Sequence, residues 1–198
     1  MKILEVGACS ILDHEFPKDI IWNKLYHRHQ PEFFTECKQI DEFLLPLVNS
    51  DLDSQSIDTV IFSMGVRDTE YYLNSFVTIQ DRHKMIDCLD RTMDWMDRLI
   101  RGNENPNRKF FLIGSSSVDL EYRQRPFYST LKIAQSRFFK ELAKNSTVGK
   151  FIEVRYNSVQ SRMCNHGMKG TEAFNKFMEV LNMYYDTLVD KHVVINLY

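Results

Sequence analysis

The hydrophobic and polar positions of this chain alternate between short apolar runs and longer amphipathic segments. Each strong run is rich in Val, Ile or Phe and nearly uninterrupted, as expected of strands that are covered on both faces. The predicted strands are Lys2–Gly7, Thr59–Ser63, Lys109–Ile113, Lys150–Arg155 and His192–Leu197, with a weaker candidate at Phe33–Cys37. Strands separated by helical segments are typical of βαβ units around a parallel sheet.

The segment Asp81–Arg101 carries the clearest helical pattern. Its apolar residues recur at spacings of four, four, three and four, which form one stripe of a 3.6-residue period. These residues are Met85, Leu89, Met93, Met96 and Ile100. Gly102 follows the last of them, and glycine in that place is a helix stop signal. Similar stripes predict helices at Phe127–Lys144 and about Thr171–Val189. Such stripes are typical of a core or a subunit interface, so they indicate no cofactor.

These elements predict a single doubly wound, Rossmann-like α/β domain over residues 1–198. No internal repeat, low-complexity run or linker divides the chain. Gly7 and Asp58 are 51 positions apart, whereas two complete βα units plus a helix need about 70. One strand–helix unit is therefore expected to be missing or replaced by Asp13–Gln30. We expect a parallel sheet of about six strands with helices on both faces.

Composition excludes several classes of protein. A net charge of −2 with scattered Lys and Arg residues argues against nucleic acid as a partner. No run approaches the roughly 20 apolar residues that span a bilayer, and Glu5 interrupts any signal-peptide pattern, so we expect no membrane association. The cysteines, which are far apart, are Cys9, Cys37, Cys88 and Cys164. Without a C-x-x-C pair they indicate reduced thiols in a cytoplasmic protein and no metal site.

The residues that indicate chemistry lie between Lys109 and Asn145. The apolar strand there ends in Gly-Ser-Ser-Ser, and Tyr128 and Lys132 open the next helix. Residues four apart share one helix face, and a nearby ammonium lowers the pKa of a tyrosine from its usual value of about 10. Tyr128 could then act as a general acid or base, with a serine donating to a substrate oxygen at the ligand-binding end of the sheet. Alternatively, Tyr128 and Lys132 lie on the surface and the serines only cap the helix.

This arrangement resembles the short-chain dehydrogenase/reductase family, whose signature is a serine followed about a dozen residues later by Tyr-x-x-x-Lys. Tyr128 lies twelve residues after Ser116, although Ser115 and Ser117 remain alternatives. The resemblance covers most of the chain, best from about residue 58 to 162. It implies Tyr128 as acid/base, Ser116 as the residue that orients the substrate oxygen, and Lys132 as the residue that lowers the tyrosine pKa and binds the nicotinamide ribose.

The resemblance also implies NAD or NADP as cofactor. Gly7, Ser10, Gly65 and Lys132 are the residues that would contact it. The acidic residue that would bind the adenosine ribose is either Glu36 or Asp41.

The glycine-rich turn departs from the family pattern Thr-Gly-x-x-x-Gly-x-Gly. The corresponding residues here are Val6-Gly7-Ala8-Cys9-Ser10-Ile11-Leu12-Asp13, so only the first glycine is present. The missing glycines would let the backbone approach a pyrophosphate. Ile11 would obstruct that approach, and Asp13 would place a negative charge where a helix N-terminus favours an anion.

Three other family positions also differ. The motif Asn-Asn-Ala-Gly is replaced by Phe62-Ser63-Met64-Gly65, and the helix asparagine of the proton relay is replaced near Gln80. Asn157-Ser158 stands where the family has Pro-Gly. The expected chemical pair is kept while the cofactor groove is altered.

Two functions from different classes follow. The first is an NAD(P)-dependent oxidoreductase acting on a small carbonyl or alcohol substrate, with Tyr122, Arg123, Arg125 and Phe127 lining its entrance or forming a solvated loop. The alternative is a degenerate relative without redox activity that serves as a binding or scaffold protein. Non-redox chemistry with the same pair, such as epimerisation or dehydration, is a third hypothesis.

A homodimer is expected through helices 81–101 and 127–144. In the family these helices pair with their symmetry mates. Trp95, Ile86 and Phe139 lie outside the main apolar stripes and suggest more apolar surface than one sheet face can cover.

Overall fold

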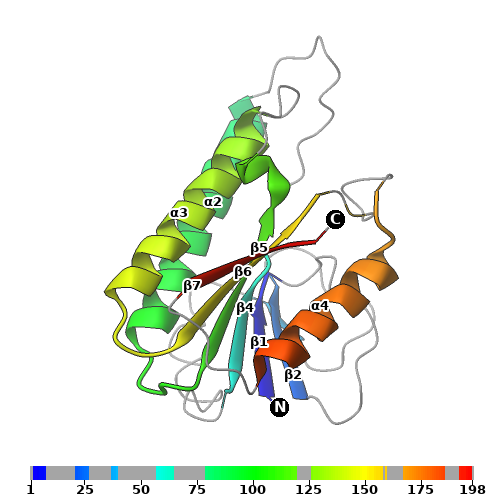
Figure 1. Cartoon of the computed structure of the whole chain (residues 1–198). Coiled ribbons are helices and arrows are strands. Elements are labelled where there is room, and N and C mark those ends of the chain that lie inside the picture. Colours follow the sequence, from blue (N-terminus) through cyan, green and yellow to red (C-terminus); the bar gives the residue numbers. More distant parts are fainter. Residues whose placement is uncertain are drawn as a thin grey trace.

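The computed structural model describes one parallel sheet with helices packed on both of its faces (Figure 1). The described residues are 2–7, 21–26, 37–39, 57–64, 79–119, 126–157, 159, 167–185 and 192–197. The strand order is β3-β2-β1-β4-β5-β6-β7, and every neighbouring pair is parallel. The doubly wound Rossmann-like class predicted from the sequence is therefore confirmed.

Apart from β2 and η1, the elements follow each other in the order that the sequence predicts. The strands are β1 Lys2–Val6, β2 Ile21–Tyr26, β3 Cys37–Gln39, β4 Thr59–Phe62, β5 Lys109–Ser115, β6 Lys150–Tyr156 and β7 His192–Leu197. The helices are α2 Ile79–Arg101, the short 3₁₀ helix η1 Ser116–Val118, α3 Pro126–Asn145 and α4 Gly170–Tyr185. The predicted helix boundaries lie within four residues of those observed.

The described sheet has seven strands against the expected number of about six. The additional strand is β2, which lies inside the segment expected to replace a missing unit and pairs with β1 from Lys2 to Val6. Its sequence, Ile-Trp-Asn-Lys-Leu-Tyr, contains two polar residues in the middle. An apolar run that is interrupted in this way does not predict a buried strand, so the sequence pattern gives no strand at this position.

The strand order changes direction at β1, which pairs with β2 on one side and β4 on the other. In open α/β sheets, ligands bind at such a switch point, beyond the carboxyl ends of the strands. The ends of β1 and β4 therefore define the edge at which a site is expected.

Helices α2 and α3 lie side by side on one face of the sheet, and α4 covers the other (Figure 1). On β5, Phe110 and Leu112 face α2 and α3, whereas Phe111 and Ile113 face α4. This alternation follows from the two-residue period of a strand. Because both faces are covered, the strands read as continuous apolar runs.

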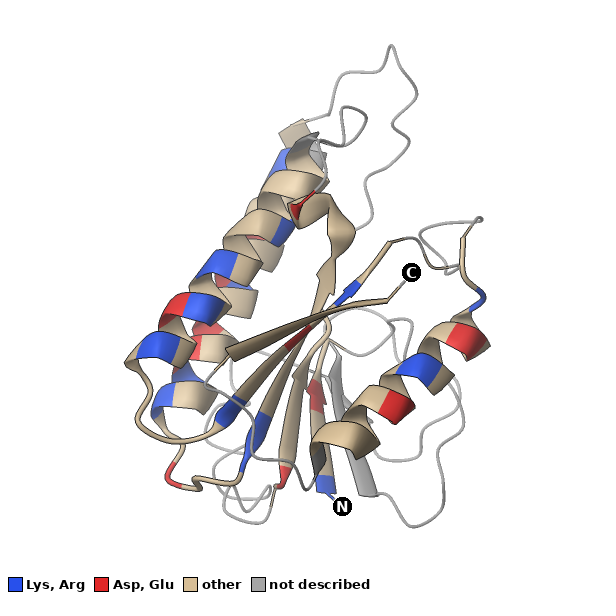
Figure 2. Cartoon of the chain, in the orientation of Figure 1, with Lys and Arg blue, Asp and Glu red and all other residues tan. Residues whose placement is uncertain are grey.

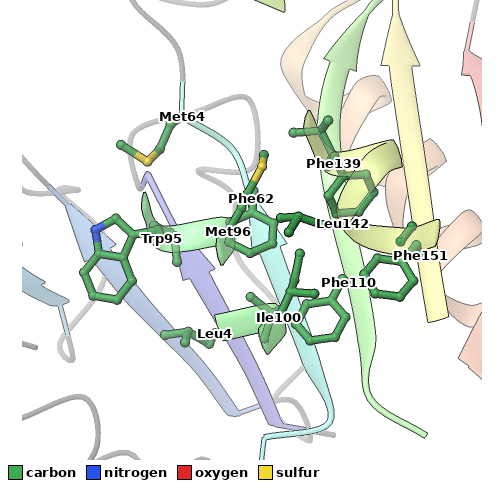
Figure 3. Close-up of a cluster of buried hydrophobic side chains, with 14 of the residues drawn as sticks. Leu4, Phe62, Met64, Trp95, Met96, Ile100, Phe110, Phe139, Leu142 and Phe151 are labelled. Carbon is green, nitrogen blue, oxygen red and sulfur yellow. The ribbon is translucent and has the colours of Figure 1, made fainter. Parts of the chain in front are cut away.

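Aromatic rings fill the layer between the sheet and helices α2 and α3 (Figure 3). Phe110 stacks between Phe62 and Phe151, with ring centroids 6.5 and 5.2 Å away. Phe139 of α3 meets Phe62 and Phe151 edge-on at 6.3 and 5.7 Å. Aromatic pairs in these geometries add about 0.5–1.5 kcal/mol each beyond the burial of apolar surface.

The outer surfaces of α2 and α3 carry charges of both signs (Figure 2). Arg91 with Asp87 and Arg98 with Asp94 form i,i+4 ion pairs of 2.9 and 2.6 Å.

Among the described helices, none is long and apolar enough to cross a bilayer.

Two of the three residues that motivated the homodimer belong to the core. Trp95 is 5% exposed and Phe139 is fully buried, so both pack against the sheet. Ile86 is 64% exposed. The apolar surface available to a partner is therefore smaller than the sequence suggested, and the homodimer itself stays a prediction.

Candidate functional site

The three consecutive serines lie where β5 ends and η1 begins. The Ser115 hydroxyl caps η1 by accepting from the Ser117 backbone N–H, and the Ser117 hydroxyl donates to Ser115 Oγ at 2.9 Å. Ser116 Oγ instead donates to Asn157 Oδ1, just beyond the end of β6, at 3.2 Å. Ser115 and Ser117 are therefore bonded to each other, whereas Ser116 spans the carboxyl ends of two neighbouring strands.

The Lys132 side chain reaches the carboxyl ends of strands β4 and β5. Its Nζ donates to the carbonyl oxygen of Ile113, near the end of β5, at 3.1 Å, and to that of Met64, just beyond β4, at 3.2 Å. Only 5% of the residue is exposed. Lys132 is thus not a solvated surface residue, and its ammonium lies at the carboxyl ends of the strands.

Burial lowers the pKa of Lys132 from its usual 10.5 to about 8. Loss of hydration disfavours the charged form, while electrostatic interactions with Cys88 and Glu153 raise the pKa. The side chain therefore still carries a proton at neutral pH.

Tyr128 lies in the first turn of α3, one turn before Lys132 on the same face of the helix. It is half-buried and packs against the aromatic core layer. Helix α3, which carries Tyr128 and Lys132, contacts η1, which begins with Ser116. The hydroxyl of Ser129, next in the chain, is buried and has no hydrogen-bond partner among the described residues.

Sequence reasoning missed two residues that contact this region. Gln135 is fully buried, and its Nε2 donates to Met64 O at 3.4 Å and to Thr92 Oγ1 of α2 at 3.0 Å. Gln135 lies three residues after Lys132, and that helical spacing was the available signal. The second residue is Cys88 of α2, whose electrostatic interaction with Lys132 raises the pKa of that lysine. The replacement for the family's helix asparagine was expected near Gln80, whose side chain lies outside the described residues.

Gly7 is required by the packing of β1 against the end of β4. Its φ is +99°, a conformation that other residues rarely adopt. A Cβ atom there would lie 2.7 and 2.8 Å from the backbone N and Cα of Met64. The missing side chain therefore accommodates Met64, which is a role that the sequence did not suggest.

The other expected cofactor contacts, Ser10 and Gly65, lie outside the described residues. The same holds for further residues discussed from the sequence: Ile11, Asp13, Glu36, Asp41, Tyr122, Arg123, Arg125 and Ser158. Phe127 is described and is 38% exposed, with the guanidinium of Arg82 over its ring at 5.8 Å.

Lys132 is the described residue best suited to hold a cofactor. An ammonium has three N–H donors, and within the described part of the chain only the Ile113 and Met64 carbonyls accept from it. Among the described residues nothing accepts from the third donor, which could bind a hydroxyl of a ligand. The described residues therefore fit the nicotinamide-ribose end of a dinucleotide. Among these same residues, no group of three or more His, Cys, Asp or Glu side chains could hold a metal ion.

Comparison with known proteins identifies the fold. No protein-family model and no curated protein matches the sequence. The chain is similar in structure to a short-chain dehydrogenase/reductase from Serratia marcescens BCRC 10948, with a TM-score of 0.72, 12% identity, and coverage of 99% of this chain and 95% of that one.

Two further solved structures are similar over nearly their whole length. Serine dehydrogenase from Escherichia coli has a TM-score of 0.70 and 15% identity, covering 100% of this chain and 97% of that one. The 3-oxoacyl-[acyl-carrier protein] reductase from Brucella melitensis, in complex with NAD, has a TM-score of 0.71 and 13% identity, covering 98% and 94%. The chain therefore has the fold of short-chain dehydrogenases/reductases, as the sequence predicted.

Proposed function

We propose that this protein is an NAD(P)-dependent oxidoreductase that interconverts a small carbonyl compound and its alcohol through Ser116, Tyr128 and Lys132. The observation that carries the proposal is the buried Lys132 ammonium at the carboxyl ends of β4 and β5.

Burying an ammonium is unfavourable, and a purely structural position would be filled more stably by an apolar residue. Lys132 nevertheless occupies such a position, with its pKa lowered to about 8, at the edge where open α/β sheets bind their ligands. Perturbed ionisable groups in such places are typical of functional sites. The bound NAD of the Brucella melitensis reductase, which has the same fold, supports the choice of cofactor.

Each residue has a defined part in the reduction. The Tyr128 hydroxyl donates its proton to the carbonyl oxygen as that oxygen becomes negative, and the Lys132 ammonium stabilises the phenolate that remains. Ser116 donates a hydrogen bond to the same oxygen once its hydroxyl turns away from Asn157. A bound NADH or NADPH would supply the hydride, so that hydride and proton together convert the carbonyl to the alcohol.

The third N–H of Lys132 would hold a ribose hydroxyl of the cofactor. Gly7, Ser10 and Gly65 would line the path of the remaining dinucleotide. Since only one of the three family glycines is present and Gly7 already accommodates Met64, we expect weaker binding than a complete glycine turn provides. We further propose a cytoplasmic location, where the buried thiol of Cys88 would stay reduced.

Titration with NADH and NADPH tests the proposal first. A ligand at 100 times its Kd stabilises the folded state by about 2.7 kcal/mol, which thermal unfolding detects. If neither dinucleotide raises the Tm or changes its own fluorescence, the redox function is wrong and a binding or scaffold role is favoured.

Turnover of a panel of small aldehydes and ketones, including ethyl acetoacetate, then tests the roles of the residues. Tyr128→Phe keeps the ring and removes the proton donor, so turnover should fall about 10²–10⁴-fold while the protein still folds. The matched control is Tyr184→Phe, at a half-buried tyrosine of α4 on the opposite face of the sheet, which should leave turnover unchanged.

A further inference from the structure

The strand β6 carries a buried ion pair on the face that α3 covers. Arg155 Nε donates to Glu153 Oε1 at 2.7 Å, and a terminal nitrogen of the same guanidinium donates to Glu153 Oε2 at 3.2 Å. Ser136 of α3 donates to Glu153 Oε2 at 2.8 Å. Glu153 is fully buried and the Arg155 side chain is only 10% exposed. The fork geometry holds the guanidinium plane in one orientation.

A glycine on the neighbouring strand makes room for this pair. A Cβ on Gly114 of β5 would lie 2.8 Å from Glu153 Oε1 and 3.1 Å from Arg155 Cγ. Gly114 also immediately precedes the three serines. The ion pair between Glu153 and Arg155 thus packs against the residue that precedes the three serines.

The remaining nitrogen of Arg155 reaches out of the core to this segment. Arg155 Nη1 donates to Asp119 Oδ2 at 2.5 Å, and Asp119 is the C-cap residue of η1. The Asp119 backbone N–H in turn donates to the Ser116 carbonyl oxygen at 3.0 Å. Arg155 therefore connects the rigid interior of β6 to the far end of the turn, while Asn157 of the same strand region contacts the Ser116 hydroxyl.

We propose that Arg155 and Asp119 form a clamp that fixes the η1 turn and thereby positions the Ser116 hydroxyl toward the substrate oxygen. This rests on the proposed function of Ser116. Both are positioning residues: they act through Ser116 rather than on the substrate.

The physical reason for a clamp is that η1 is a three-residue turn. Such a turn has few internal hydrogen bonds to fix its position. A misplacement of about 1 Å in a catalytic group can lower a rate about 10²-fold. The guanidinium, already oriented by Glu153 and Ser136, loses little freedom when it also binds Asp119.

Asp119→Ala removes the carboxylate at the exposed end of the clamp and leaves the buried pair intact. We expect kcat with the carbonyl compound that the wild type reduces fastest to fall about tenfold. The KM for NADH or NADPH should stay unchanged, because Asp119 is not among the residues proposed to hold the cofactor. Asp119→Glu keeps a carboxylate at a site that is 53% exposed and should recover most of the activity. Asp94→Ala, at a similarly exposed ion pair on α2, is the matched control and should have no effect.

A double variant identifies the route of the effect. If the clamp acts through Ser116, Asp119→Ala should not reduce kcat any further in a Ser116→Ala background. The proposal would be overturned if the two substitutions reduce kcat independently, so that their factors multiply in the double variant. It would also be overturned if Asp119→Ala leaves kcat unchanged while Ser116→Ala lowers it.

Hydrogen–deuterium exchange separates this proposal from the redox function. In Asp119→Ala, a peptide covering residues 115–119 should exchange about tenfold faster, while peptides of α2 exchange as in the wild type. Unchanged exchange overturns the clamp whether or not the protein has activity. Faster exchange in a protein that turns over no carbonyl compound supports the clamp and rejects the redox function.

Discussion

Lys132 joins two properties that usually exclude each other in a single residue. It is buried, and it remains protonated near neutral pH because electrostatic interactions with Cys88 and Glu153 oppose the effect of burial on its pKa. Its ammonium also donates to two main-chain carbonyls. This balance makes the folded state sensitive to pH.

Lys132→Met should reveal that sensitivity. The Lys132 pKa is about 8 in the folded protein and 10.5 without burial, so both states hold the proton below pH 8. Between pH 8 and 10.5 the unfolded state binds more protons at this residue, so the contribution of Lys132 to the free energy of unfolding rises with pH. Relative to Lys132→Met, the wild type should gain up to about 3 kcal/mol across this window.

Urea unfolding at pH 7, 8, 9 and 10 measures this difference in stability. Lys144→Met is the control, because Lys144 is exposed near the end of the same helix. A constant difference for Lys132→Met would show that Lys132 is not buried.

Gly7→Ala should destabilise the protein by more than a typical exposed substitution. The left-handed conformation alone disfavours alanine by about 1–2 kcal/mol, and the new Cβ would clash with the Met64 backbone. Relief of this clash would move Met64, whose carbonyl oxygen accepts a hydrogen bond from Lys132. The substitution should therefore also lower turnover. Thermal unfolding compares it with Gly170→Ala at the start of α4, where φ is not left-handed. Equal losses would contradict the close approach of β1 and β4.

At the scale of elements, β6 contributes more than its place in the sheet. Its apolar residues pack on both layers, Glu153 accepts a hydrogen bond from Ser136 of α3, and Arg155 forms an ion pair with Asp119 at the end of η1. A buried ion pair stabilises little in total, but breaking it leaves an unpaired charge in the core.

Glu153→Leu should therefore destabilise the protein by about 3–5 kcal/mol, because Arg155 would remain buried without its main partner. The double variant Glu153→Leu/Arg155→Met should recover most of that loss, since it removes both charges. Urea unfolding of the two variants decides between these outcomes. If the double variant is less stable than Glu153→Leu, the stability arises from packing rather than from charge pairing.

At the scale of the whole molecule, we propose a homodimer that pairs helices α2 and α3 with those of a second copy. Ile86 and Ile133 are 64% and 46% exposed on these helices. Ile86→Glu should shift the protein to a monomer because it places a charge in an apolar contact. Light scattering at tens of micromolar tests this, with Met183→Glu on α4, at a residue that is 63% exposed, as the control. A monomeric wild type would contradict the proposal.

The sequence alone determined the class of fold because the signal is local. Buried parallel strands read as short apolar runs, and α2 reads as a single stripe ending at Gly102. The same local reading led to the expectation of Tyr128, Lys132 and the serines as one group. It did not identify β2, whose central residues are Asn and Lys.

Only the tertiary structure decided what surrounds the site. The carbonyl oxygens that hold Lys132 come from residues 68 and 19 positions away, so no local pattern could reveal them. Ser116 is distinguished from its neighbours by Asn157, 41 positions later. Nothing in the sequence pattern shows that Glu153 and Arg155 form an ion pair, which the fold buries beside Gly114. Contacts between strand ends depend on the order of the strands in the sheet, which sequence periodicity does not encode.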